Sequence, residues 1–262
     1  MCNLLSIKKQ NILIYKDKGV EENSLVNTVK FFKERIDTSF YNITYVKSNE
    51  LIEKDWGKNT KLLVIPGGAD VQYDRALRGI GCHKIRRFVA EQGGKFLGIC
   101  AGAYFGSRRV EFALGTELEV AENRELGFFE GKTVGPILKE YVYNSEKGSC
   151  AADILFKPLG IRFFSYYNGG CTFIDSDDSQ KDYEVLATFH DKKDIPSIIK
   201  RNIGSGTVVL SGVHFEHNTE ALKKSDSLET STICKTILQT KDQMKRAIEF
   251  ILCKTLGLKT VD

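Results

Sequence analysis

Four short segments in the first hundred residues constrain the fold of this chain more than any other feature. They cover residues 11–15, 41–46, 61–65 and 95–99, and each has the length and the Ile, Leu, Val or Tyr content of a strand. Between the first and second of these segments, and again between the third and fourth, apolar residues recur at the spacing of a helix. Strands and helices in this order form a mostly parallel sheet with helices on both faces. The sequence therefore predicts an α/β fold.

Three segments have the apolar spacing of helices. Residues 25–36 carry one such pattern. Ile85 and Phe88 belong to the apolar face of a second helix, which should end at Gly93 and Gly94. Residues 242–256 place their apolar side chains on one face and should pack against the core.

The second half of the chain is richer in strands. Residues 175–182 form an acidic loop that we expect to be a solvated turn, and the polar residues 216–239 are expected to form a mobile excursion. No repeat or domain boundary is visible, so a single domain over residues 1–262 is predicted. The segments that look extended are 134–142, 162–167, 183–189, 197–199 and 207–211.

The composition excludes several classes of protein. Hydrophobic residues make up 42% and charged residues 27% of the chain, which is typical of a globular protein and not of a disordered one. A net charge of +4 is too small and too dispersed to indicate binding to nucleic acid or a membrane surface. No apolar stretch approaches the length of about 18–20 residues that spans a bilayer.

The cysteines and the N-terminus predict the cellular environment. Seven cysteines are scattered along the chain without a CxxC pair, which favours free thiols over a disulfide framework or a zinc site. The first ten residues lack the pattern of a secretory signal. We therefore expect a cytoplasmic protein without a bound metal.

Cys100 lies where an apolar strand runs into a turn of small residues, 98–102, that a helix follows. A nucleophile elbow needs this arrangement, because a tight turn holds the nucleophile in a strained backbone conformation and tolerates only small neighbours. The N-terminus of the following helix favours the thiolate, and the N–H of Ala101 can face a developing oxyanion. A small buried cysteine at the end of a strand is the alternative.

His214 and Glu216 follow the predicted strand 207–211. If the chain stays extended, both side chains lie on one face, so that Glu216 can orient the imidazole while its other nitrogen faces Cys100. Two exposed polar residues at the start of a loop are the alternative. The remaining histidines are interpreted as surface residues: His83, His190 and His217.

Two glycine-rich turns complete the set of motifs. In the turn 66–70, Gly68 can bring a second backbone N–H to the oxyanion, whereas the spacing excludes a phosphate-binding loop. Residues 166–170 either wall a pocket or close a hairpin. The residues predicted to line a substrate pocket are Gly67, Asp70, Tyr104, Tyr167, Asn168, Gly169 and Phe215.

The motifs at 65–70, 98–105, 167–170 and 211–216 together resemble the class I glutamine amidotransferase-like superfamily. More narrowly, they are similar to the N-terminal amidotransferase-like domain of eukaryotic biotin–protein ligases and its stand-alone bacterial relatives. The resemblance covers about residues 11–256. It implies a flavodoxin-like sheet.

The same resemblance implies a triad of Cys100, His214 and Glu216 with no metal or organic cofactor. Glutamine-hydrolysing members usually carry a glutamine where this chain has Tyr104, and a proline where it has Phe215. The first change removes an amide that helps to hold glutamine. No glycine- and arginine-rich biotinyl-adenylate loop is present, and 262 residues leave no room for a second catalytic domain, so biotin ligation is not expected.

The function that these residues and the resemblance imply is that of a cysteine-nucleophile hydrolase or amidotransferase-like enzyme. It would act on a small amide or acyl compound. A further expectation is that it works with an unidentified partner enzyme. A non-catalytic small-molecule or protein-binding module with the same fold is the alternative, and a peptidase is a third reading.

Overall fold

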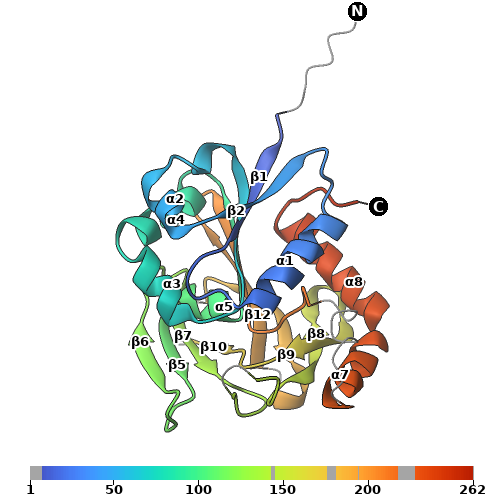
Figure 1. Cartoon of the computed structure of the whole chain (residues 1–262). Helices are drawn as coiled ribbons and strands as arrows, with labels where there is room; N and C mark the ends of the chain where they lie inside the picture. The colour runs from blue at the N-terminus through green and yellow to red at the C-terminus, as the bar shows by residue number, and fades with distance from the viewer. Residues whose placement is uncertain (1–7, 143–144, 176–180, 194, 218–227, 262) are drawn as a thin grey trace, which may run out of the picture.

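The computed structural model describes residues 8–142, 145–175, 181–193, 195–217 and 228–261. At its centre is a sheet of nine strands, counted within these ranges, in the order β2-β1-β3-β4-β13-β12-β11-β8-β9 (Figure 1). Its parallel strands are β1 (Gln10–Tyr15), β2 (Tyr41–Val46), β3 (Thr60–Ile65), β4 (Lys95–Ile99) and β13 (Gly206–Ser211). Its antiparallel extension consists of β8 (Cys150–Phe156), β9 (Ile161–Tyr167), β11 (Glu184–Phe189) and β12 (Ile195–Ile203).

The parallel half confirms the flavodoxin-like α/β fold. Its order, β2-β1-β3-β4-β13, is the doubly wound order 2-1-3-4-5 with β13 in the fifth place. The five strands predicted for this half are all present. Since parallel strands share a direction, the turns after β1, β3, β4 and β13 lie at one edge of the sheet.

Helices cover both faces of the sheet, because alternate side chains of each strand point to opposite sides. Ile12 and Ile14 of β1 face one core, and Leu13 and Tyr15 face the other. The first face packs against α1 (Glu22–Arg35), α7 (Leu228–Leu238), α8 (Lys241–Glu249) and the π-helical turn Phe250–Thr255. The second packs against α2 (Ser48–Glu53), α3 (Asp70–Leu77), α4 (Ile80–Ala90) and α5 (Ala101–Phe105). Figure 1 shows these two groups on opposite sides of the sheet.

A second sheet, which the sequence pattern did not predict, lies beside the carboxyl edge. Its four strands among the described residues run in the order β10-β7-β5-β6. They are β5 (Ser107–Phe112), β6 (Val120–Asn123), β7 (Phe129–Gly135) and β10 (Thr172–Ile174). The predicted extended segment 134–142 is wrong beyond Gly135, where Pro136 has no N–H to continue the ladder.

The prediction of a mobile excursion over residues 216–239 is wrong for its described C-terminal part. Residues 218–227 lie outside the described residues, but 228–238 form helix α7, which packs on β8 and β9. Its buried side chains, Ile233, Cys234 and Ile237, are diluted by threonines in the sequence, which hid the helical pattern. The acidic loop 175–182 also falls largely outside the described ranges. None of the described helices has the length and apolar character needed to cross a membrane.

Candidate active site

Cys100 lies at a strained strand-to-helix turn, as the sequence predicted. It follows β4 directly, precedes α5, and has φ 52° and ψ −106°, a conformation that residues with a side chain rarely adopt. The small neighbours are a steric requirement. A Cβ at Gly98 would lie 2.4 Å from the Gly102 oxygen, and one at Gly102 would lie 2.1 Å from the Ile65 oxygen.

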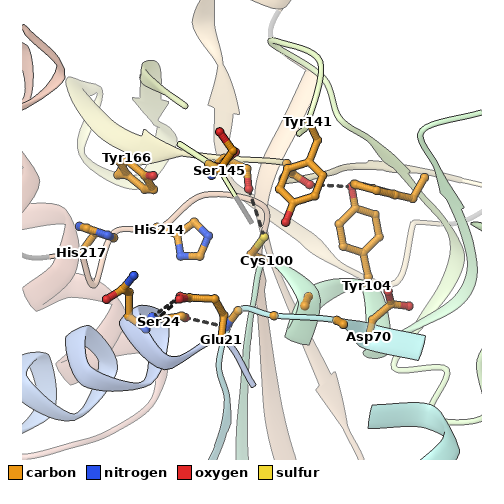
Figure 2. Close-up of a pocket in the computed structure, with 18 of the residues that line it drawn as sticks. Glu21, Ser24, Asp70, Cys100, Tyr104, Tyr141, Ser145, Tyr166, His214 and His217 are labelled. Carbon is orange, nitrogen blue, oxygen red and sulfur yellow. Dashed lines mark hydrogen bonds between the residues drawn. The ribbon is translucent and has the colours of Figure 1, made fainter. Parts of the chain in front are cut away.

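His214 lies beyond the end of β13, and its ring is positioned from two sides. Its backbone N–H donates to the Tyr166 oxygen at 2.9 Å, and its Nδ1 is 2.7 Å from Oε1 of Glu216. The Cys100 side chain lies near enough to the same imidazole to raise its pKa. Figure 2 shows the ring next to Cys100, with β4 and β13 supplying the two residues from neighbouring strands.

The backbone reaches this arrangement by a different route from the one expected. We predicted an extended chain through Glu216, but the chain turns after His214, and the N–H of His217 donates to the His214 oxygen at 3.2 Å. The two side chains therefore meet across a turn and not along one face of a strand.

The protonation of His214 follows from three opposing influences. Burial lowers the pKa of the imidazole, whereas the Glu216 carboxylate and Cys100 raise it, and the net direction is well above the ordinary value. This direction favours the protonated ring over the neutral one. A protonated imidazole beside a thiol favours the thiolate, which is the nucleophilic form of cysteine.

Two backbone N–H groups lie at the same edge of the sheet without acceptors. Within the described ranges, neither the Gly68 N–H nor the Ala101 N–H donates to any protein group. The turn that carries Gly68 is held by Ser24, whose Oγ accepts from the Gly67 N–H at 2.8 Å, and by Tyr73, whose hydroxyl donates to the Gly67 oxygen at 3.0 Å. Two such donors suit an oxygen that gains negative charge.

A cavity of about 670 Å³ opens above Cys100. Five of the seven residues predicted to line a pocket are in its walls, namely Gly67, Asp70, Tyr104, Asn168 and Gly169. Cys100, Ala101, Gly68 and His214 also reach it.

The other two predicted pocket residues, Tyr167 and Phe215, do not line this cavity. Tyr167 is fully buried on the opposite face of β9, where its hydroxyl donates to the Gly170 oxygen at 2.9 Å, and its neighbour Tyr166 lines the cavity instead. Adjacent residues of a strand face opposite sides, so a shift of one position exchanges them. Phe215 packs on Phe31 of α1, with ring centroids 5.8 Å apart.

One whole wall of the cavity was not predicted from the sequence. The segment after β1 supplies Glu21, Ser24 and Asn27. The end of β1 at the carboxyl edge was a usable signal for this wall. His217, interpreted as a surface residue, lines the same wall and stacks on Tyr166 with ring centroids 4.2 Å apart, so that interpretation is wrong.

Tyr104 and Asp70 have structural partners that the sequence did not show. The Tyr104 hydroxyl donates to the Gly169 oxygen at 3.1 Å, and burial raises its pKa well above the ordinary value, so it remains a donor. Asp70 forms an ion pair with the buried Arg124, whose Nε lies 2.8 Å from Oδ2. This ion pair fastens the second sheet to the turn that carries Gly68.

The described residues contain no group of three or more His, Cys, Asp or Glu side chains that could hold a metal ion. The cysteines within the described ranges are free, namely Cys82, Cys100, Cys150, Cys171, Cys234 and Cys253.

Comparisons with known structures agree with the fold. A glutamine amidotransferase of Thermotoga maritima superposes with a TM-score of 0.58 at 12% identity, covering 95% of this chain and 99% of that one. A second glutamine amidotransferase gives a TM-score of 0.53 at 19% identity, covering 78% and 90% of the two chains. At these identities the likeness concerns the fold alone.

Sequence comparisons identify the family. An uncharacterized protein of Chlamydia muridarum is 39% identical over 80% of this chain and 82% of its own length. The biotin–protein ligase of Schizosaccharomyces pombe is 32% identical over 95% of this chain, which spans only 38% of that protein. The model of the family described as "Biotin-protein ligase, N terminal" matches residues 10–262. The chain therefore belongs to the biotin–protein ligase N-terminal family, with the fold of the glutamine amidotransferases.

Proposed function

We propose that this protein is a cysteine-nucleophile hydrolase or amidotransferase-like enzyme that acts on a small amide or acyl compound. The observation that carries the proposal is the strained backbone of Cys100, which holds its sulfur beside the His214–Glu216 pair. Backbone strain of this kind costs about 1–3 kcal/mol and persists at functional sites where it serves a purpose.

The proposed reaction is acyl transfer through a thioester. The Cys100 sulfur attacks the carbonyl carbon, a C–S bond forms, and the carbonyl electron pair moves to the oxygen, which the Gly68 and Ala101 N–H groups stabilise. His214 then gives its proton to the leaving nitrogen as the C–N bond breaks. A water molecule, deprotonated by His214, releases the acid from the thioester, and Glu216 orients the ring throughout.

We propose that biotin ligation is not among the activities of this chain. The sequence contains no glycine- and arginine-rich loop of the kind that holds biotinyl-adenylate.

Labelling with iodoacetamide at pH 7, followed by peptide mapping, tests the activated nucleophile. We expect Cys100 to react at least about tenfold faster than Cys150 and Cys253, because thiolate content sets the rate of alkylation. Cys100 is only 8% exposed, whereas the two comparison cysteines are more exposed, so accessibility alone predicts the opposite order.

Two variants complete this test. His214→Gln should slow the labelling of Cys100 to the rate of an ordinary thiol, while His83→Gln, on the exposed side of α4, should leave it unchanged. If Cys100 in the unmodified protein reacts no faster than Cys253, the activated-nucleophile proposal is wrong.

A non-catalytic binding module is the second candidate, and one contact favours it. The Cys100 sulfur lies 3.7 Å from the backbone oxygen of Asn168, an acceptor that suits a protonated thiol. In that case Cys100→Ala would leave ligand binding and every measured activity unchanged.

A further inference from the structure

The cavity above Cys100 has two chemically different walls. One is apolar and aromatic, and most of it comes from the second sheet. Tyr104 packs edge-to-face on Phe112 with ring centroids 5.6 Å apart, and Phe112 packs in the same way on Tyr141 at 5.6 Å. Leu118 and Val120, from the β5–β6 hairpin, extend this surface, which we call the apolar wall.

The opposite wall is polar and contains hydrogen-bond acceptors. The Glu21 carboxylate caps α1 by accepting from the Asn23 and Ser24 N–H groups at 2.9 and 2.6 Å, and each oxygen has capacity for a further donor. Asn27 lies beside His217, with Nδ2 3.3 Å from Nε2. Glu146 also lines the cavity. We call this surface the polar wall.

His214 lies on the side of the polar wall. Its ring is 5.8 Å from that of Tyr166 and 6.4 Å from that of His217, measured between centroids. Figure 2 shows Cys100 between the two walls, with His214, His217 and Glu21 on one side and Tyr141 and Tyr104 on the other.

Acyl-transfer chemistry assigns one part of the substrate to each wall. The imidazole that protonates the leaving nitrogen must lie next to it, so the leaving amine occupies the polar side. The acyl group, attached to the other side of the carbonyl carbon, then faces the apolar wall. We propose that the substrate class is an amide between an apolar acyl group and an amine that bears hydrogen-bond donors or a positive charge. This inference rests on the function proposed above.

The same assignment makes glutamine a poor substrate. Its acyl part carries a carboxylate, which would face the apolar wall without a partner. Among the described lining residues no Lys or Arg side chain is available to pair with that carboxylate. Its leaving group, ammonia, would leave the polar wall unused. Tyr104 contributes its aromatic ring to the apolar wall where a glutamine side chain would supply an amide.

A panel of four amides tests the acyl preference and the amine preference separately. It consists of N-hexanoylputrescine, N-hexanoyl-β-alanine, N-succinylputrescine and glutamine, with kcat/KM measured from the release of amine or ammonia. The kcat/KM of N-hexanoylputrescine should exceed that of N-succinylputrescine at least about tenfold, because the succinyl carboxylate would be buried against apolar side chains without a partner. The kcat/KM of N-hexanoylputrescine, whose amine part is cationic, should exceed that of N-hexanoyl-β-alanine, whose amine part is anionic, about threefold. The factor is modest because Glu21 is exposed.

Matched variants assign these preferences to the two walls. Leu118→Ser should reduce the hexanoyl preference about tenfold, while Leu114→Ser should not, since Leu114 is 53% exposed on the same hairpin and outside the cavity. Glu21→Gln should remove the preference for the cationic amine, and Glu22→Gln, one residue further along α1, should keep it.

The burst of p-nitrophenol from p-nitrophenyl acetate tests the Cys100 nucleophile separately from the substrate class. A burst that Cys100→Ala abolishes, together with the expected preferences, supports both. The same burst with equal or better turnover of glutamine, or with no turnover of the hexanoyl amides, overturns the substrate class and leaves the nucleophile in place. The absence of a Cys100-dependent burst overturns the proposed function itself.

Discussion

Replacing Cys100 by alanine is expected to lower kcat/KM about 10⁴-fold on any acyl substrate that the protein turns over. The substitution removes the atom that would form the thioester, and the residual rate would come from the backbone donors and from binding alone. His214→Gln should lower kcat/KM by about the same factor, because the nucleophile and its base act as a unit. The measurement is steady-state hydrolysis of a p-nitrophenyl ester and of the best amide of the panel.

Matched substitutions show that the loss belongs to these positions. Cys253→Ala removes a free thiol in the C-terminal π-helical turn and should leave kcat/KM unchanged. Circular dichroism should show the same folded state for every variant. Turnover that survives in Cys100→Ala would mean that the reaction occurs elsewhere in the molecule.

Gly102→Ala is expected to lower the free energy of unfolding by about 3 kcal/mol, the upper part of the usual range for overpacking. The added Cβ would lie 2.1 Å from the Ile65 oxygen, and that oxygen belongs to the central strand β3 and cannot move aside easily. Relief requires α5 to shift away from the sheet, which would also displace Cys100. Urea denaturation with a linear extrapolation measures the loss.

The control for this prediction is Gly160→Ala. Gly160 has φ 60° and no atom within 4 Å of its added Cβ, so the substitution changes backbone strain without a clash. A non-glycine residue in this conformation costs about 1 kcal/mol. Equal losses for the two variants would show that contact between α5 and β3 does not govern the stability of the Cys100 turn.

The sequence predicted those parts of the fold and site that depend on local patterns. The apolar runs gave the parallel strands, and the small residues around Cys100 gave the strand-to-helix turn. The shared carboxyl edge of parallel strands then placed Gly68 beside Cys100. Each of these features is determined within a few residues of the chain or by a topological rule.

The parts that were missed depend on contacts between distant segments. The second sheet joins residues 107–112 to 129–135 in parallel, a pairing that no local pattern reveals. The ion pair between Arg124 and Asp70 also joins distant segments, and only the fold brings the two residues together. Tyr167 was predicted to line the pocket, but Tyr166 does so, and this difference has another cause. Which side chains of a strand point to a given face depends on the register of the strand with its neighbours.

The titration of His214, followed by NMR of the imidazole nitrogens, tests most directly whether this ring links Cys100 to Glu216. The chain has four histidines, so the signals can be assigned with single substitutions. We expect a pKa well above the ordinary value of about 6.5, with the proton retained as pH rises through neutrality. Cys100→Ala and Glu216→Gln should each lower this pKa, because each removes a group that stabilises the protonated ring. A His214 that titrates at or below about 6.5, and that does not respond to Cys100→Ala, would contradict the proposed relay.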